Sequence, residues 1–349
     1  MGLPNILIEF KNQASTVTKR GERGIVAVIV LGAPQKVMHL EDVTQIPSTL
    51  EDDSKDFVKN AFLGGVNPVK EVVLVVSDTI ENGLAKLETE KFDYAAVTPD
   101  LSSSDAATVA TFFKTLRDSK HIKSKVVLPN NAANHEGIIN FTTDNIVVGA
   151  KTYTTAEYCS RIASLLAGTP LQQSATYFVL SDVDDVPKLT KSALDTKINN
   201  GEFCIFHDGE KVKVARAVNS LTTVTGDKTD DYKSIKIVDT MDLIYSDIKR
   251  TCEDNYIGKF PNNYDNKCNL IVAIQTYLER LRDDELLDES VTVEIDMASQ
   301  IDYIKENGGD VSAMSEQEIK EYNTGTNVYI SSSFKILNSI EDINIKFYI

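Results

Sequence analysis

The sequence predicts a mostly parallel α/β domain followed by an α+β domain, with extended β-strand arms at both termini. A nearly continuous apolar run at residues 24–31 (GIVAVIVL) is typical of a strand covered on both faces. Helical and strand-like patterns then alternate as far as Pro170, which indicates a parallel sheet. Beyond Pro170 the pattern changes to a hairpin and two long amphipathic helices. We therefore predict an N-terminal arm at residues 1–22, an α/β domain at 23–170, an α+β domain at 171–335 and a C-terminal arm at 336–349.

The α/β domain is predicted from segments whose periodicity switches between two residues and 3.6 residues. Strands are expected at residues 24–31, 72–76, 92–97, 125–128 and 145–148, and helices at 82–87, 104–117 and 154–167. The last helix has the clearest boundaries. Thr154 and Glu157 have the spacing of a capping box, and Gly168 is expected to end the helix.

The α+β domain begins with a predicted hairpin. Residues 202–206 and 212–215 flank the turn His207-Asp208-Gly209, and Asp-Gly between two β-rich runs is a strong hairpin signal. Two amphipathic helices follow, with apolar stripes expected to face the core: Ile237, Met241, Ile244 and Ile248 in the first, and Ile271, Ile274, Tyr277, Leu278 and Leu281 in the second. A strand at residues 291–295, a helix at 298–307 and a capping box at Ser315 and Glu318 complete the domain.

Both ends of the chain have the alternation of a β-strand. Ile6, Ile8 and Phe10 alternate near the first residue, and the last eight residues repeat the pattern with the apolar set Ile343, Ile345, Phe347 and Ile349. Such a strand needs a sheet to join. Periodicity leaves two alternatives open: pairing within its own domain, or donation to a neighbouring copy of the chain.

Composition excludes several functional classes. The chain has 349 residues, of which 42% are hydrophobic, enough for a sizeable core. The formal net charge of -16 repels phosphate backbones, so no nucleic-acid binding is expected. No apolar run approaches the roughly 18 residues of a membrane span, and no basic-then-apolar leader begins the sequence, so we expect intracellular synthesis and no membrane insertion.

Motifs that carry chemistry are missing. Gly64-Gly65 lacks the spacing of a phosphate-binding loop, and the four cysteines and four histidines have no metal-ligand spacing. Asp182, Asp184 and Asp185 lack the glycine of a calcium loop, so we expect a solvated loop. We predict no catalytic residue, no cofactor and no metal site. An enzyme remains an alternative, because catalytic partners need not be near in sequence.

A series of short motifs resembles the contractile tail sheath proteins of myophages, defective prophages and R-type bacteriocins of Gram-positive bacteria. These motifs extend over nearly the whole chain in a fixed order. They lie at residues 19–26 (KRGERGIV), 166–171 (LAGTPL), 207–209 (HDG), 217–223 (AVNSLTT), 256–259 (YIGK), 266–267 (NK) and 340–342 (IED). Each is weak alone, and their order and spacing together carry the resemblance.

The resemblance implies a structural subunit that polymerises helically around an inner tube. Both terminal arms would add strands to sheets of neighbouring subunits, and contraction would drive the tube through a target cell envelope. The α+β domain would face the tube, with the charged residues Glu279, Arg280, Arg282, Asp283 and Asp284 as a candidate tube contact beside the alternative of a solvated helix face.

The implied partners are the chain itself, the inner tail tube protein, and baseplate and tail terminator proteins. The implied location is the bacterial cytoplasm during assembly, and then a released virion or bacteriocin particle. Two alternatives stay open: a non-contractile self-assembling filament protein, and a small-molecule-binding α/β enzyme.

Overall fold

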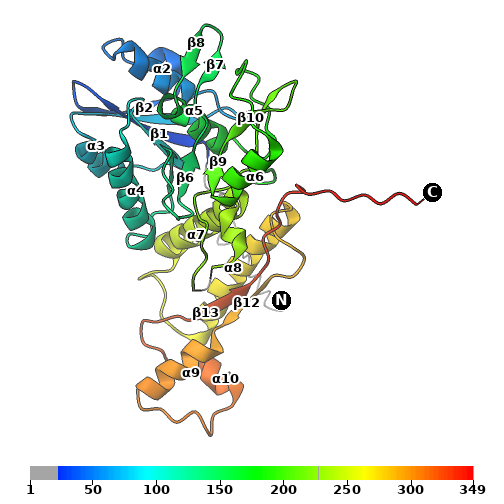
Figure 1. The fold of residues 1–349 in the computed structure, drawn as a ribbon. Helices are drawn as coiled ribbons and strands as arrows, with labels where there is room; N and C mark the ends of the chain where they lie inside the picture. Colours follow the sequence, from blue (N-terminus) through cyan, green and yellow to red (C-terminus); the bar gives the residue numbers. More distant parts are fainter. Residues whose placement is uncertain (1–22, 227, 349) are drawn as a thin grey trace, which may run out of the picture. The chain divides into compact units, whose positions relative to one another are not determined.

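A computed structural model describes residues 23–226 and 228–348, and these fall into two compact units. The sheet unit runs through Asp239 and includes the final described residues from Asn338 onward. The helical unit comprises Thr240–Leu337. Helix α7 (Ile235–Asn255) begins in the sheet unit and continues into the helical unit (Figure 1).

Within the described residues, seven strands of the sheet unit form one sheet in the order β2-β3-β1-β4-β5-β6-β9. Its pairs are parallel, except that β2 runs antiparallel to β3. The strands are β1 (Ile25–Leu31), β2 (Lys36–Leu40), β3 (Glu71–Ser77), β4 (Tyr94–Val97), β5 (Lys125–Pro129), β6 (Ile138–Phe141) and β9 (Glu202–Phe203). The mostly parallel α/β sheet predicted from the sequence is therefore confirmed.

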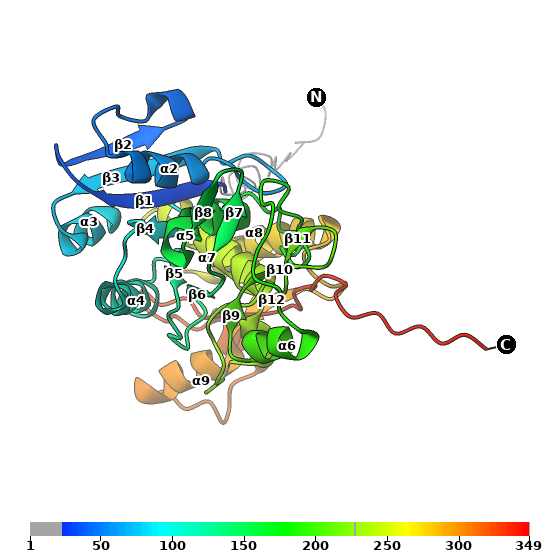
Figure 2. The ribbon, with the colours of Figure 1, turned by 45° about the horizontal axis from the view of Figure 1, so that its top comes forward.

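Helices cover both faces of this sheet (Figure 2). One core cluster joins Val26, Val28 and Val30 of β1 to α2 (Asp52–Asn60) and α5 (Thr155–Ala167). The other joins Ile25, Ala27 and Ile29 to α3 (Ile80–Leu87) and α4 (Ser103–Asp118). Burial on both faces explains why β1 is a continuous apolar run and does not alternate.

Helix α5 begins with the predicted capping box, but the glycine at its C-terminus is required for a different reason than a helix cap. The Thr154 side chain accepts from the backbone N–H of Glu157, and the Glu157 carboxylate accepts from Thr154 N–H, so the capping box is confirmed. Gly168 has right-handed backbone angles, φ −84° and ψ 0°. A Cβ there would lie too close to the carbonyl oxygen of Asn67 and the nitrogen of Gly65. Close backbone approach, and not a left-handed cap, requires this glycine.

The predicted strand at residues 202–206 is two strands in two sheets. Phe203 of β9 pairs with Phe141 in the main sheet, whereas β10 (Ile205–His207) pairs with β11 (Val212–Val214). Only Cys204 separates them. Because β9 completes the main sheet, the compact unit continues to Asp239, and the domain boundary predicted near residue 170 differs from the structure.

The helical unit has the predicted helices and one small sheet. Tyr277 of α8 (Tyr264–Asp283) donates a 3.0 Å hydrogen bond to Asp247 of α7, and the apolar stripe of α8 is buried at Ile274, Tyr277, Leu278 and Leu281. Strand β12 (Thr292–Ile295) pairs antiparallel with β13 (Ile330–Ser333). Helices α9 (Met297–Glu306) and α10 (Glu316–Glu321) lie between them in the sequence, and the capping box at Ser315 and Glu318 is confirmed.

The remaining elements of the sheet unit are short. They are the 3-10 turns η1 (Val43–Gln45) and η2 (Asp230–Lys233), the hairpin β7 (Ile146–Val148) with β8 (Lys151–Tyr153), and α6 (Lys191–Asn199). The predicted strand at 145–148 therefore lies outside the main sheet. Among the described residues, no helix combines the length and the apolar character needed to cross a bilayer.

Candidate functional site: the C-terminal arm segment and the roots of both arms

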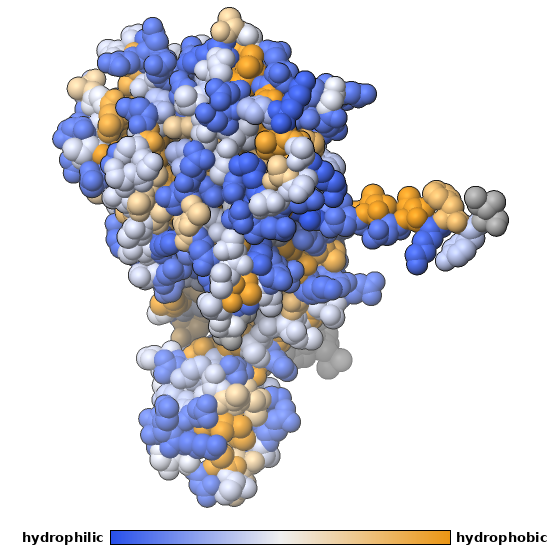
Figure 3. All heavy atoms as spheres, viewed as in Figure 1, coloured by the Kyte–Doolittle hydropathy of each residue, from blue (hydrophilic) through white to orange (hydrophobic). Residues whose placement is uncertain are grey.

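The C-terminal arm segment, residues 343–348, exposes its apolar side chains. Ile343 is 73% exposed, Ile345 68% and Phe347 84%. These residues belong to no strand or helix in the described structure, and Figure 3 shows hydrophobic atoms along the projecting segment. The other predicted arm residues, Ile6, Ile8, Phe10 and Ile349, lie outside the described residues. That these seven residues link subunits remains a prediction.

Glu341 and Asp342, which we call the root of the C-terminal arm, are held on the sheet unit by Arg216. Its Nε lies 2.8 Å from Oε2 of Glu341, and its Nη2 lies 2.5 Å from Oδ2 of Asp342. The Thr176 hydroxyl donates to the other Glu341 oxygen at 2.7 Å and accepts from Ala217 N–H at 3.0 Å. Glu341 and Asp342 come directly before Ile343, so the hydrogen bonds end where the exposed segment begins.

The charges at this root favour an ionised Glu341. Burial alone would raise the pKa of Glu341, but hydrogen bonds from Arg216 and Thr176 hold it below its ordinary value. The hydrogen bonds to Glu341 and Asp342 raise the pKa of Arg216. The ion pair is thus present at neutral pH.

The root of the N-terminal arm is Arg23, which directly follows the predicted arm. Its side chain is part of a buried ionic cluster. Arg23, the first described residue, has its Nη2 2.6 Å from Oδ2 of Asp239. The second oxygen of Asp239 accepts from Tyr94 at 2.8 Å and lies 2.8 Å from Nζ of Lys125. Tyr94 and Lys125 are register partners on the neighbouring strands β4 and β5, so the sheet aligns both donors. Asp93 accepts from the backbone N–H groups of Gly24 and Ile25.

Asp239 stays ionised although it is buried. Burial alone would raise the pKa of Asp239, but Arg23 and Lys125 hold it below its usual range. The same carboxylate raises the pKa of Arg23 against the effect of burial. The sequence offered no signal for this cluster, because Arg23, Tyr94 and Lys125 each lie more than 100 residues from Asp239.

Among the described residues, the two-stranded sheet of the helical unit has two unpaired edges. Strands β12 and β13 pair with each other, and the described residues supply no further strand to either. Phe334, which follows β13, lines a groove of about 380 Å³ together with Met241, Ile244, Tyr245 and Ile248 of α7. An open sheet edge beside apolar side chains can accept an added strand.

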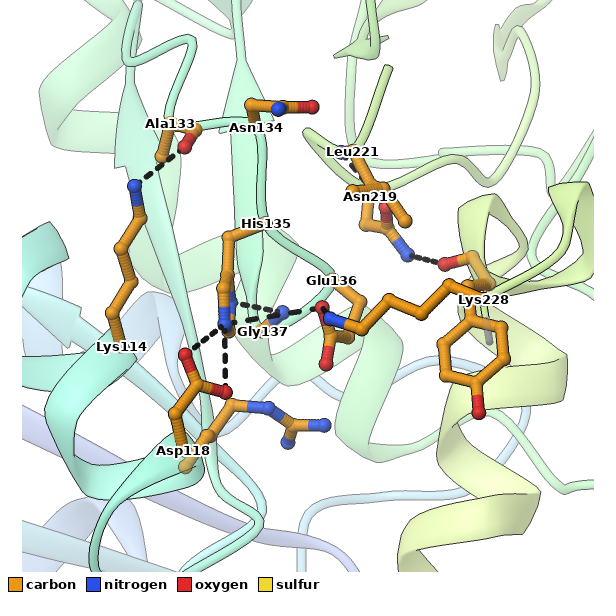
Figure 4. A network of polar contacts seen from close by, with 12 residues as sticks. Lys114, Asp118, Ala133, Asn134, His135, Glu136, Gly137, Asn219, Leu221 and Lys228 are labelled. Carbon is orange, nitrogen blue, oxygen red and sulfur yellow. Dashed lines mark hydrogen bonds and ion pairs between the residues drawn. The ribbon is translucent and has the colours of Figure 1, made fainter. Parts of the chain in front are cut away.

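Among the described residues, the polar cluster of Asp118, His135 and Glu136 comes nearest to the ligand set of a metal site. Figure 4 shows Asp118 reaching from α4 to His135, whose Nε2 lies 3.3 Å from both Asp118 oxygens. Glu136 lies 3.8 Å from the same nitrogen and is paired with Lys228 at 2.9 Å. Lys228 and the nearby guanidinium of Arg117 add positive charge, which opposes a dication. The cluster instead joins two loops, since His135 exchanges backbone hydrogen bonds with the Ser220 hydroxyl.

The acidic run at residues 182–185 lies in a loop, as the sequence predicted, with Asp184 and Asp185 exposed and Asp182 half-buried. Asp182 forms a two-point ion pair with Arg161, at 3.0 and 3.1 Å, and accepts from Tyr158. Asp184 accepts from Gly149 N–H at 2.6 Å. These partners lie more than 20 residues upstream, beyond the reach of a local motif.

Comparison with known proteins relates the fold of this chain to solved sheath structures. The fold is similar to the sheath tail protein of Desulfitobacterium hafniense, with a TM-score of 0.70, 20% identity, and 85% of this chain and 94% of that chain covered. It is also similar to the anti-feeding prophage helical sheath in its contracted state, with a TM-score of 0.73, 16% identity, and 100% and 99% covered. The fold is therefore that of a sheath protein.

The sequence matches the same class of protein. A family model for the phage tail sheath protein central domain matches residues 75–220, and one for the phage tail sheath C-terminal domain matches residues 227–349. The tail sheath protein of Clostridium phage phiCD119 is 38% identical over 353 residues, with 99% of each chain covered. The chain belongs to the phage tail sheath family.

Membership in this family confirms the predicted resemblance and decides between enzyme and structural protein. Tail sheath proteins are structural components of tail-like particles, so the chain is not an enzyme. The alternative of a small-molecule-binding α/β enzyme is wrong. The parallel sheet serves here as a scaffold, because a fold does not fix a function.

Proposed function

We propose that this chain is the subunit of a contractile sheath, which polymerises helically around an inner tube and contracts to drive the tube through a target cell envelope. Subunits are linked by strand exchange of their termini. One observation carries the proposal: the apolar side chains of the arm segment are exposed directly after a root that is firmly held.

Exposed apolar side chains on an extended segment favour donation to a second copy. Burying Ile345 and Phe347 together is worth about 3–6 kcal/mol, and pairing of the backbone adds about 0.5–1.5 kcal/mol for each hydrogen bond. A contact in which a segment of one copy enters a different surface of the next is heterologous, and repetition of such contacts builds rings or helices.

The receiving surface in this proposal is the β12–β13 sheet of a neighbouring subunit. Its outer edges have unsatisfied strand-pairing capacity within the described residues, and the groove beside Phe334 supplies apolar contacts. Addition of a strand at such an edge is β-augmentation. The predicted N-terminal arm, with Ile6, Ile8 and Phe10, would join the same kind of edge.

The proposed partners are further copies of the chain, an inner tail tube protein, and baseplate and tail terminator proteins. The helical unit would face the tube, with the charged end of α8 at residues 279–284 as the contact. Assembly would take place in the bacterial cytoplasm, before release as a virion or bacteriocin particle. The contracted state named for the anti-feeding prophage sheath supports a lattice with more than one state.

The test compares three forms of the chain by electron microscopy of assemblies. A truncation after Asp342, which keeps the root, should stay folded and fail to form tubes. Ile345→Ser with Phe347→Ser should fail in the same way. The matched control, Asn344→Ser with Lys346→Ser, changes the opposite side of the same strand and should still assemble.

Normal tubes from the truncation would refute strand exchange by the C-terminal arm. The remaining alternative, a non-contractile filament, predicts one lattice only. Images of native particles that never show a shortened, widened sheath would favour that filament over the contractile subunit.

A further inference from the structure

The root of the C-terminal arm is a built contact and not a chance surface pair. The side chain of Glu341 is only 16% exposed, although Ile343, two residues later, is 73% exposed. Both Glu341 oxygens are used, one by Arg216 and one by Thr176. Burial lowers the pKa of Lys236, which also interacts electrostatically with Glu341.

The receiving half of this contact is ordered by bonds that do not involve the arm. Thr176 N–H donates to Ser174 at 3.1 Å, and the Thr176 hydroxyl accepts from Ala217 N–H. Tyr177 N–H donates to the carbonyl of Val214, at the end of β11. The Thr176 side chain and the backbone beside Arg216 are therefore held by bonds that do not depend on the arm.

The geometry also marks where a strand can start. Successive side chains of a regular strand point to opposite faces. One guanidinium contacts both Glu341 and Asp342, so the chain cannot continue as a regular strand through these two residues. The segment that can pair with another sheet begins at Ile343.

We propose that Arg216 and Thr176 form a latch that fixes where the C-terminal arm leaves the sheet unit, and thereby fixes the register in which the arm is donated. This inference rests on the proposed function. A slip of one residue would turn Ile343, Ile345 and Phe347 to the wrong face of the receiving sheet. A fixed root therefore keeps the arm in register as well as attached to its subunit. Arg216 is a positioning residue: its planar fork suits two neighbouring carboxylates, which a lysine cannot match.

The first measurement uses the isolated full-length subunit at a protein concentration too low for polymerisation. Cys252→Ser and Cys268→Ser first remove the less buried native thiols. Spin labels are then attached at Asn344→Cys in the arm and at Lys188→Cys in the sheet unit, and double electron–electron resonance measures the distance between them. The wild-type pair should give a narrow distribution and Arg216→Gln a broad one, with Arg216→Lys between them. A distribution equally narrow in Arg216→Gln would overturn the latch.

The second measurement is the critical concentration for polymerisation, by sedimentation. Arg216→Gln should raise it at least tenfold with an unchanged thermal unfolding midpoint, and Arg216→Lys should recover part of the loss. Lys191→Gln, which removes the exposed Lys191–Asp195 pair of α6, is the matched control and should assemble normally. Unchanged polymerisation of Arg216→Gln would refute the positioning role.

One further variant, together with the truncation after Asp342, separates the explanations. Glu341→Gln changes only the arm and leaves the sheet unit intact, so it decides the question if Arg216→Gln unfolds. It should also raise the critical concentration, and normal assembly would count against the latch. If the truncation after Asp342 still forms tubes, the proposed strand exchange by the C-terminal arm fails. If the truncation blocks assembly but Glu341→Gln and Arg216→Gln do not, only the latch fails.

Discussion

Replacing Asp239 by asparagine should be among the most destabilising single changes in the sheet unit. The substitution keeps the shape of the side chain and removes its charge. The side chains of Asp239 and Lys125 are 7% and 4% exposed, so water cannot take over the lost interaction, whereas Arg23, at 18%, is slightly closer to solvent. Breaking a buried ionic contact by removing one partner typically costs about 3–5 kcal/mol.

This cost can be measured by urea unfolding of the chain truncated after Asp342, so that polymerisation does not interfere. With an m-value of about 3 kcal/mol/M, the midpoint should fall by about 1–2 M. Lys125→Met combined with Asp239→Asn should lose less than the sum of the two single changes, because the double variant no longer buries the Lys125 charge opposite a neutral group. A midpoint within about 0.2 M of wild type for Asp239→Asn, or strictly additive losses, would refute this account of the cluster.

Three other predictions concern the sheet unit. Burial lowers the pKa of His135 against the carboxylates of Asp118 and Glu136, with Arg117 acting in the same direction as burial. Below the ordinary histidine pKa of about 6.5, the unfolded chain therefore binds the proton more readily than the folded chain does, so the free energy of unfolding should fall from pH 7 to pH 5. In His135→Gln this free energy should fall less steeply with pH, and equal pH slopes in the two proteins would contradict the prediction. Gly168→Ala should cost about 1–3 kcal/mol in thermal unfolding, since its Cβ would collide with backbone atoms, and an unchanged midpoint would show that the loop yields. Thr154→Ala should cost about 1 kcal/mol through loss of the α5 cap, whereas the exposed Thr152→Ala should be near neutral.

Local signals predicted the fold well where the cause is local. The capping boxes at Thr154 and Ser315 involve residues three apart, and both are present in the structure. The hairpin predicted from residues 202–206 and 212–215 is present at Ile205–His207, whereas Glu202 and Phe203 join the main sheet instead, because the choice between Phe141 and Val214 as neighbours depends on tertiary structure. Strand β2 escaped prediction because only Leu40 of its five residues is buried.

The candidate site was predicted only in its outer part. The alternation of Ile343, Ile345 and Phe347 is visible in the sequence, and their exposure agrees with a segment that lacks a partner in the single chain. The roots could not be predicted, since Arg216 lies 125 residues from Glu341, and Arg23 lies 216 from Asp239. Contacts of this kind exist only once the sheet has brought the two segments together.

The split at Cys204 has a mechanical consequence for a subunit that is pulled by its arm. Tension on the arm segment reaches Arg216, two residues after the end of β11. From there it passes through the β10–β11 hydrogen bonds, and through the bond from Ala215 N–H to the carbonyl of Cys204. Because β9 lies one residue away and is paired to β6, this chain of hydrogen bonds connects the root of the arm to the main sheet.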